Sequence, residues 1–243
     1  MSHLIVIPTF NERDNIQALV ERLLAHPSLP DVCVVDDDSP DGTHKIVADI
    51  ARHNTRLRLM HRVGKKGRGS AVLDGLTEGL KGNYQFIFEM DADFSHEPNE
   101  LSRFLEVPED MDLVIGSRYL SGSTIVNWPL RRRLFSFLAN RYARAILGVP
   151  LSDYTNGYRR YRADALRCID LTSITATGYI VLSYLSYRLY RQGARIAEVP
   201  IRFVNRKRGA SNLSRHEIWH ALTAVLSIPG EMKKRQAFMR KIH

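Results

Sequence analysis

Short apolar runs alternate with amphipathic helical patterns through the first 117 residues of the chain. The apolar run 4–8 is followed, after a polar turn, by apolar residues that recur on one helical face over 16–24. The pairing then repeats, with apolar runs at 32–35, 57–60, 86–90 and 113–115 and helical patterns from 43, over 69–80 and over 98–105. Strands that alternate with helices form a mostly parallel sheet. The pattern therefore predicts an α/β fold, a Rossmann-like sheet flanked by helices.

The second half of the chain has a more helical pattern. We expect helices over 131–147, 163–169, 179–191 and 213–228, and a short strand pair on either side of Pro200. A length of 243 residues favours one large domain over two small ones. Near-average Gly (15) and Pro (10), without low-complexity tracts, exclude a disordered chain.

No stretch of the sequence predicts a membrane span. The longest charge-free run, 171–187, has 17 residues with several Ser and Thr, whereas a spanning helix needs about 20 apolar residues. The first residues lack the basic segment and apolar region of a signal peptide. Cys33 and Cys168, the only cysteines, both have apolar neighbours, so we expect two buried thiols in a reducing, cytoplasmic compartment.

The net charge of +9 hides a strong asymmetry. Residues 1–117 carry a net charge of −8 and residues 118–243 a net charge of +17. The acidic half suits a cation, and the basic half suits phosphate, nucleic acid or an anionic membrane surface. Solvated charges on unrelated faces are the alternative.

The sharpest motif is the apolar strand 86–90, which is followed by Asp91 and Asp93. In open α/β sheets, ligands bind beyond the carboxyl ends of the strands. Two carboxylates one residue apart can hold one Mg²⁺ or Mn²⁺ ion, and such ions commonly bridge to substrate phosphates. A solvated turn is the alternative, which a position after a central strand disfavours.

Two further motifs follow other predicted strands. The acidic segment 34–43 offers carboxylates that accept hydrogen bonds from a base or a ribose, although Asp41 or Thr43 could simply cap the next helix. The segment 64–70, rich in Gly, Lys and Arg, lacks the ending of a P-loop, which argues against a kinase. Its cations could still contact a diphosphate, with a flexible surface loop as the alternative.

Arginines dominate the basic half. Arg118 and the runs 131–133 and 206–208 could converge on phosphate groups, which guanidinium binds through paired hydrogen bonds. The alternatives are a solvated helix face and a nucleic-acid patch. Among the histidines we find a metal-ligand spacing at His216 and His220, and without a third ligand a helix face is favoured over zinc.

In their order along the chain, these motifs resemble the family 2 glycosyltransferases of GT-A fold, and more narrowly the catalytic domain of dolichol- or polyprenol-phosphate mannose synthases. The matching segments span nearly the whole chain. They are IPTFNERDN (7–15), VVDDDSPDGT (34–43), GKKGRGSAV (64–72), MDADFSHEP (90–98), IGSRY (115–119), NWPLRRRLFS (127–136), SDYTNGYR (152–159) and EVPIRFVNRKRGASNLS (198–214).

The resemblance implies roles for the matching residues. The donor nucleotide sugar would be bound by Pro8, Phe10, Glu12, Val35, Asp37, Asp91, Ala92, Asp93 and Arg206. Mg²⁺ or Mn²⁺ would be held by Asp91, Asp93 and Ser95, and the acceptor lipid phosphate by Arg118, Arg132 and Ser136. Asp91, Asp93 and Arg118 would be the catalytic residues. Two positions depart from the family pattern: Asn212 stands in place of a lysine and Tyr184 in place of an acidic residue. The departure at Tyr184 leaves the identity of the donor sugar open.

The implied reaction is inverting, metal-dependent transfer of a hexose, in the first place mannose from GDP-mannose, to a polyprenyl or dolichyl phosphate. In a single domain 1–243, residues 1–117 would form the nucleotide and metal half, 118–228 the basic helical acceptor half and 229–243 a basic tail. The tail, which follows an amphipathic helix, and the lack of a span imply a peripheral enzyme on the cytoplasmic face of a membrane, with a small membrane-anchoring protein as an optional partner.

Several alternatives remain open on the sequence. Within the family, the donor could be UDP-glucose or the acceptor a different one. A sugar nucleotidyltransferase also pairs a nucleotide-binding sheet with a metal-holding aspartate, but releases pyrophosphate. A nucleic-acid binder would use the basic half and show steep salt dependence; it would leave Asp91 and Asp93 without a task, so we expect no nucleic-acid partner.

Overall fold

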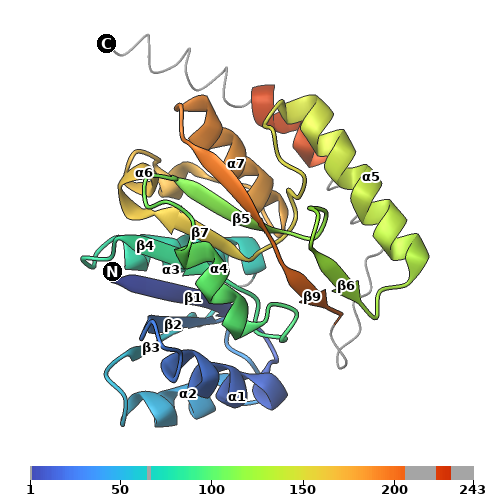
Figure 1. The fold of residues 1–243 in the computed structure, drawn as a ribbon. Helices are drawn as coiled ribbons and strands as arrows, with labels where there is room; N and C mark the ends of the chain where they lie inside the picture. Colours follow the sequence, from blue (N-terminus) through green and yellow to red (C-terminus); the bar gives the residue numbers. More distant parts are fainter. Residues whose placement is uncertain (1, 65–66, 206–222, 231–243) are drawn as a thin grey trace, which may run out of the picture.

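The computed structural model describes residues 2–64, 67–205 and 223–230 (Figure 1). Strands and helices alternate through the first half as β1 (His3–Thr9), α1 (Arg13–Leu24), β2 (Asp31–Asp36), α2 (Thr43–Ala51), β3 (Leu57–His61), α3 (Arg68–Gly79), β4 (Phe86–Glu89), the 3₁₀ turn η1 (Pro98–Glu100), α4 (Leu101–Leu105) and β5 (Leu113–Ser117). The second half contains β6 (Thr124–Val126), α5 (Leu130–Leu147), β7 (Arg159–Arg162), α6 (Ala163–Arg167), η2 (Leu171–Ser173), α7 (Ile180–Arg191), β8 (Ile196–Pro200) and β9 (Arg202–Val204). Residues 223–230 are helical, whereas most of the helix predicted over 213–228 lies outside the described residues.

Seven strands form one sheet in the order β3-β2-β1-β4-β7-β5-β8. Neighbouring strands are parallel except at β7, which runs antiparallel to both β4 and β5. The predicted α/β fold, a mostly parallel sheet flanked by helices, is confirmed. Because β7 and β8 come from the second half of the chain, strands from both halves share this sheet.

Helices cover both faces of the sheet (Figure 1). Ile5 of β1 packs with α1, α2 and α4 on one face, and Val6 packs with α3 and α7 on the other. These neighbours point to opposite faces because side chains alternate along a strand. The long helix α5 lies to one side beside the 223–230 helix (Figure 1), where Ala143 and Val225 join the Val6 core.

The register of the parallel strands brings the motif residues to one edge of the sheet. Pro8 of β1 pairs with Val35 of β2, and Val6 of β1 pairs with Glu89 of β4. The three strands therefore run side by side; β1 and β2 end together at Thr9 and Asp36, and β4 ends slightly earlier, beside Val6. The segments that follow them, with the predicted donor and metal residues, meet at this edge.

Strand β7 is absent from the sequence prediction because its residues, Arg-Arg-Tyr-Arg, contain no apolar run. Arg159 and Arg160 are nevertheless fully buried. Their guanidinium groups donate to the backbone carbonyls of Leu182 (2.7 Å) and Phe104 (2.8 Å), respectively. Buried cations are tolerated when their N–H groups are satisfied in this way.

Both short strands predicted around Pro200 are present as β8 and β9, but they do not pair with each other. Strand β8 closes one edge of the large sheet, whereas β9 pairs with β6 in a separate two-stranded sheet. The chain passes from one sheet to the other at Ile201, which is buried. The sequence analysis does not predict β6, because a strand of three residues is too short to show a periodic pattern of apolar side chains.

The prediction of two buried thiols holds for Cys33 and is wrong for Cys168, which is exposed just after α6. Cys168 is the C-cap residue of α6 and faces solvent, whereas the next residue, Ile169, is buried in the core. In the described ranges of the chain, no helix is long and apolar enough to cross a membrane.

Candidate active site

A cavity of about 160 Å³ lies at the carboxyl ends of β1, β2 and β4. Its lining includes seven residues predicted to bind the donor: Pro8, Phe10, Glu12, Asp37, Asp91, Ala92 and Asp93. Thr9, Arg68, Ala71 and Tyr179 complete the lining. A larger hollow of about 320 Å³ beside α2 contains none of the predicted site residues within the described part of the chain.

Val35 lies apart from the other predicted donor residues. Its side chain is fully buried in the core and packs against Gly75 of α3. A Cβ atom added at Gly75 would lie only 3.0 Å from Cγ2 of Val35. The structure thus places this side chain under the site and outside the cavity lining.

Asp91 and Asp93 lie in a short turn that follows β4 and is fixed by backbone hydrogen bonds. The backbone N–H of Ser95 donates to Asp93 Oδ1 (3.0 Å), and Ser95 itself is buried. The backbone N–H of Asp91 donates to His96 Nδ1 (3.0 Å). The two carboxylates therefore enter the same cavity from a rigid turn.

His96 and Asn156 support this turn, and the sequence analysis did not single them out. His96 is fully buried, and its Nε2 lies 2.6 Å from Asn156 Oδ1. Burial lowers the pKa of His96, which keeps the ring neutral, with Nδ1 accepting from Asp91 and Nε2–H donating to Asn156. The amide of Asn156 in turn donates to the carbonyl of Gly116 at the end of β5. A histidine five residues after a strand-end aspartate was the available signal.

Arg68, in the first turn of α3, is the counter-ion of the carboxylates at this site. Its Nη2 lies 2.6 Å from Asp91 Oδ1 and 2.9 Å from Glu89 Oε1. Its guanidinium group stacks on the Tyr179 ring, 4.5 Å from the centroid. Nη1 is buried and has no hydrogen-bond partner among the described residues.

Glu89, the last residue of β4, has no exposed surface. Burial raises the pKa of this carboxyl, and the Arg68 and Arg159 cations oppose the rise. The charge of Arg68 is in turn maintained against burial by Asp91 and Glu89, which raise the pKa of the guanidinium. Arg68, Glu89 and Asp91 therefore form one coupled, mostly buried charge cluster.

In the acidic segment after β2, some carboxylates fix the loop and one lines the cavity. Asp36 Oδ2 accepts from the hydroxyls of Thr9 (2.8 Å) and Ser39 (2.7 Å), which fixes the loop. Asp37 lines the cavity and is held by Arg62, whose Nε donates to it (2.7 Å). Asp41 accepts from the backbone N–H of Thr43 (2.9 Å), the first residue of α2, whereas the N-cap position itself is occupied by Gly42.

Arg118, Arg132 and Ser136, the predicted acceptor residues, lie in one patch around Trp128. The guanidinium groups of Arg118 and Arg132 lie 5.2 and 4.8 Å from the centroid of the Trp128 ring. Ser136 accepts from the hydroxyl of Tyr119 (2.7 Å), the neighbour of Arg118. Trp128 Nε1 is buried without a hydrogen-bond partner in the described ranges, which leaves a third donor at this patch.

Arg118 is held in place by Asp153. Two parallel bonds, Nε–Oδ2 and Nη2–Oδ1, are both 2.7 Å long. Burial tends to raise the pKa of Asp153, but the Arg118 cation outweighs it and lowers that pKa. Asp153 was not predicted as a functional residue; its position in the motif 152–159 was the available signal.

Some predicted positions fall elsewhere. Arg206, with the rest of the run 206–208, and Asn212 lie outside the described residues. Tyr184 is buried in the core on α7 and does not line the cavity.

The donor set at the strand end fits a hard divalent cation. Asp91, Asp93 and Ser95 offer only oxygen ligands, which Mg²⁺ and Mn²⁺ prefer. The pairing of Asp91 with Arg68 shows that this end of the cavity accommodates positive charge.

The fold and the site together define a glycosyltransferase. The family model described as glycosyl transferase family 2 matches residues 4–170 of the chain, which belongs to this family. Two relatives with more than 40% sequence identity are similar to the chain over nearly its whole length. A polyprenol monophosphomannose synthase of Mycolicibacterium smegmatis is 42% identical, with 98% of this chain and 91% of the relative covered. An undecaprenyl-phosphate mannosyltransferase of Micrococcus luteus is 43% identical, with 93% of each chain covered.

Solved structures with a similar fold have much lower sequence identity. A glucosyl-3-phosphoglycerate synthase of Mycobacterium tuberculosis, in complex with Mn²⁺, UDP-glucose and phosphoglyceric acid, is 19% identical with a TM-score of 0.66 over 94% of this chain and 80% of its own. The same enzyme in complex with Mg²⁺ and UDP is 20% identical, also with a TM-score of 0.66, over 94% of this chain and 79% of its own. These likenesses support the GT-A fold.

Proposed function

We propose that this enzyme transfers mannose from GDP-mannose to a polyprenyl phosphate, with inversion, to give a mannosyl-phosphate lipid. The observation that carries the proposal is the presence of two complementary sites in one domain. A carboxylate-lined cavity contains Asp91 and Asp93, and a separate cationic patch contains Arg118 and Arg132. The names of the two relatives above 40% identity describe transfer of mannose to such a lipid phosphate by those proteins.

At the donor end, Asp91, Asp93 and Ser95 would hold Mg²⁺ or Mn²⁺, which offsets the charge that develops on a departing diphosphate. Asp37 is suited to accept hydrogen bonds from the nucleoside, because Arg62 fixes its carboxylate at the cavity wall. Arg68 lines the cavity, and its guanidinium group would donate to the diphosphate. This chain thus supplies both fixed carboxylates and a guanidinium at the leaving group.

At the acceptor end, the chain needs to position a nucleophile without activating it. A phosphate monoester has a second pKa near 6, so it is mostly dianionic at neutral pH and attacks the anomeric carbon without a general base. Arg118, Arg132 and the Ser136 hydroxyl would orient that dianion. Asp153 fixes Arg118 through two hydrogen bonds, which is the rigidity that such positioning requires.

A membrane surface is the proposed location of the acceptor. Helix α5, which carries Arg132 and Ser136, also exposes five large apolar side chains: Leu130, Leu134, Phe135, Phe137 and Leu138. Arg131, Arg133 and Arg141 are exposed on the same helix. Apolar side chains beside arginines are suited to the headgroup region of an anionic leaflet, where a lipid phosphate would be within reach. We place the enzyme peripherally, on the cytoplasmic face.

The test is a donor survey. Purified protein is incubated with Mn²⁺ or Mg²⁺, a short polyprenyl phosphate and GDP-mannose, UDP-glucose or UDP-N-acetylglucosamine, and the lipid is analysed by mass spectrometry. The expected product is a hexosyl-phosphate lipid from GDP-mannose. Product from UDP-glucose would keep the reaction and change the donor. The assay is repeated with added vesicles. If no donor gives a lipid product either with or without vesicles, the proposal is overturned.

A further inference from the structure

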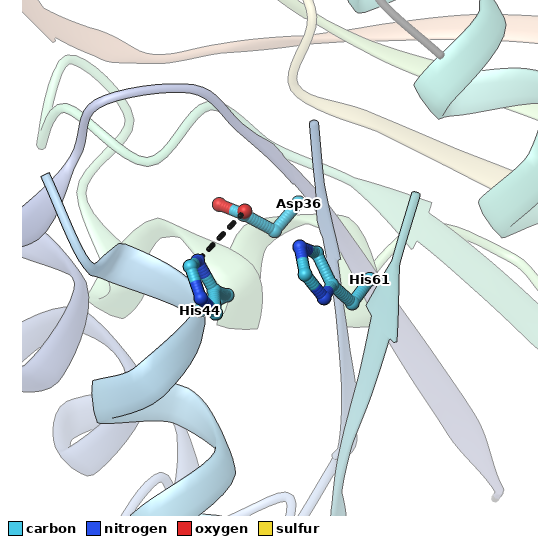
Figure 2. Close-up of side chains that lie close together, drawn as sticks. All are labelled: Asp36, His44 and His61. Carbon is cyan, nitrogen blue, oxygen red and sulfur yellow. Dashed lines mark ion pairs between the residues drawn. The ribbon is translucent and has the colours of Figure 1, made fainter. Parts of the chain in front are cut away.

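Three metal-ligating side chains meet at a point outside the donor cavity (Figure 2). Asp36 ends β2, His44 lies in the first turn of α2 and His61 ends β3. One ligand atom from each lies within 4.8 Å of the other two. These three residues are absent from the described lining of the cavity that contains Asp91 and Asp93.

The three ligand atoms lie close together, and a rotation of one histidine side chain is needed before both rings direct a nitrogen to one ion. The rings of His44 and His61 are stacked, with centroids 4.4 Å apart and planes 7° apart. His44 Nδ1 lies 3.7 Å from Asp36 Oδ1, is buried, and has no hydrogen-bond partner among the described residues. That distance is too long for a hydrogen bond. Two ligands on one tetrahedral Zn²⁺, each at about 2.0–2.1 Å, are about 3.3 Å apart. Asp36 and His44 therefore need to approach by a few tenths of an ångström, and rotation of a histidine side chain brings the third ligand to the same ion.

Neighbouring groups hold the ligands in position. The backbone N–H of Ser39 donates to Asp36 Oδ1 (2.9 Å), which orients the carboxylate toward His44. His61 Nε2 lies 2.8 Å from Asp38 Oδ1. Hydrogen bonds from further residues to the ligands are a regular feature of zinc sites, because they set the orientation of each ligand.

We propose that Asp36, His44 and His61 form a binding site for Zn²⁺, separate from the proposed Mg²⁺ or Mn²⁺ site. Two imidazoles and one carboxylate suit Zn²⁺, whereas the all-oxygen set at Asp91 and Asp93 suits the harder ions. Water takes the fourth position, while Asp38 remains the hydrogen-bond partner of His61. The ion joins the ends of β2 and β3 to the start of α2, and so braces the loop that presents Asp37 to the donor cavity.

The sequence shows no sign of this site because its histidines are 17 residues apart. Pairing of β2 with β3 places His61 directly beside Asp36 in the register, and the turn into α2 brings His44 to the same point.

The experiment measures Zn²⁺ bound by metal-free protein, using equilibrium dialysis and elemental analysis. The parent is the Asp91→Asn/Asp93→Asn double variant, so that the proposed donor metal site does not contribute. We expect one Zn²⁺ per chain in this parent. His44→Ala and His61→Ala should each weaken binding by at least about tenfold. The matched control is His53→Ala, an exposed histidine just after α2, which should bind as the parent does.

A second readout separates a site from surface adsorption. Co²⁺ in a tetrahedral site gives intense visible absorption, and we expect this band in the parent and its loss in His44→Gln and His61→Gln, which keep the side-chain volume better than alanine. Each variant is first compared with the parent by circular dichroism without metal. Equal zinc binding by the His44, His61 and His53 variants would overturn the proposal, as would a parent that binds no zinc while the unmutated protein does.

Discussion

Replacement of Arg68 by methionine should destabilise the metal-free protein and strengthen metal binding at the same time. Arg68 neutralises Asp91, whose side chain is 19% exposed, and Glu89, which is 0% exposed. Removing one member of a buried ion pair typically costs about 3–5 kcal/mol. Because Asp91 retains some solvent and the Tyr161 hydroxyl still donates to Glu89 (3.3 Å), we expect the lower end, about 3 kcal/mol.

For a chain of this size, 1 kcal/mol shifts the melting temperature by roughly 2–4 °C, so Arg68→Met should melt roughly 6–12 °C below the parent in a chelator. Saturating Mn²⁺ should recover most of this loss, because Asp91 regains a counter-charge. In the unmutated protein, a metal at the proposed site would have to displace Arg68 from Asp91. The variant avoids that step and should bind Mn²⁺ without nucleotide at least about tenfold tighter, which corresponds to about 1.4 kcal/mol.

The assay is chemical and thermal unfolding of both proteins with and without Mn²⁺, with binding measured by the electron paramagnetic resonance of free Mn²⁺. The control is Arg52→Met, because Arg52 and its partner Asp49 are both largely exposed and such pairs contribute little. If Arg68→Met in chelator is as stable as the Arg52 control, or binds Mn²⁺ more weakly than the parent, the counter-ion argument fails.

The cluster of Arg68, Glu89 and Asp91 also makes the stability of the protein depend on pH. Burial raises the pKa of Glu89 above its value in the unfolded chain, so folding favours the protonated form and stability is lost as pH rises through the folded pKa. Arg68 opposes this rise, and its removal should raise the pKa of Glu89 further. The stability deficit of Arg68→Met should therefore be smaller near pH 5 than at pH 8. An equal loss of stability at both pH values would show that the charge of Glu89 is not the source of the destabilisation.

Three further outcomes follow from the site. Asp93→Asn should lose metal-dependent transfer with little change in melting temperature, and unchanged transfer in metal-buffered assays would remove Asp93 from the metal site. Arg132→Ala should raise the KM for lipid phosphate about tenfold or more, with a small effect on the KM for the nucleotide sugar, since a charge-assisted hydrogen bond contributes about 1.5–3 kcal/mol; the reverse pattern would contradict the division into two sites. Leu134→Gln together with Leu138→Gln should weaken sedimentation with anionic vesicles while turnover of a short, water-soluble acceptor is kept, and equal sedimentation would show that α5 does not face the membrane.

Much of the nucleotide half was predictable from the sequence because its signals are local. Strands β1, β2 and β4 are continuous apolar runs, since both faces of a central parallel strand are buried. Chain direction then places the residues after these strands at one edge. Asp37, Asp91 and Asp93 therefore meet in one cavity, as their positions after strands indicated.

For the proposed acceptor patch, charge indicated that Arg118 and the run 131–133 could meet a phosphate, and only the resemblance selected Arg132 and Ser136. Arg118 and Arg132 are 14 residues apart, with no period that links them. They meet because the chain returns from β6 into α5, so that Trp128 lies beside both guanidinium groups. Charge composition indicated an anionic ligand, but it did not separate residues that would bind a phosphate from those that face solvent.

By itself, the sequence determined the alternation of strands and helices, the edge of the sheet at which the cavity lies, and the acidic and basic halves. Tertiary structure decided which charges are paired: Arg159 enters a central antiparallel strand, Arg68 neutralises Asp91, and Asp153 fixes Arg118. The physical reason is that periodicity reports on burial of apolar side chains, which is a local property. The place of a buried charge depends on partners far along the chain, which only the packed fold brings within hydrogen-bond distance.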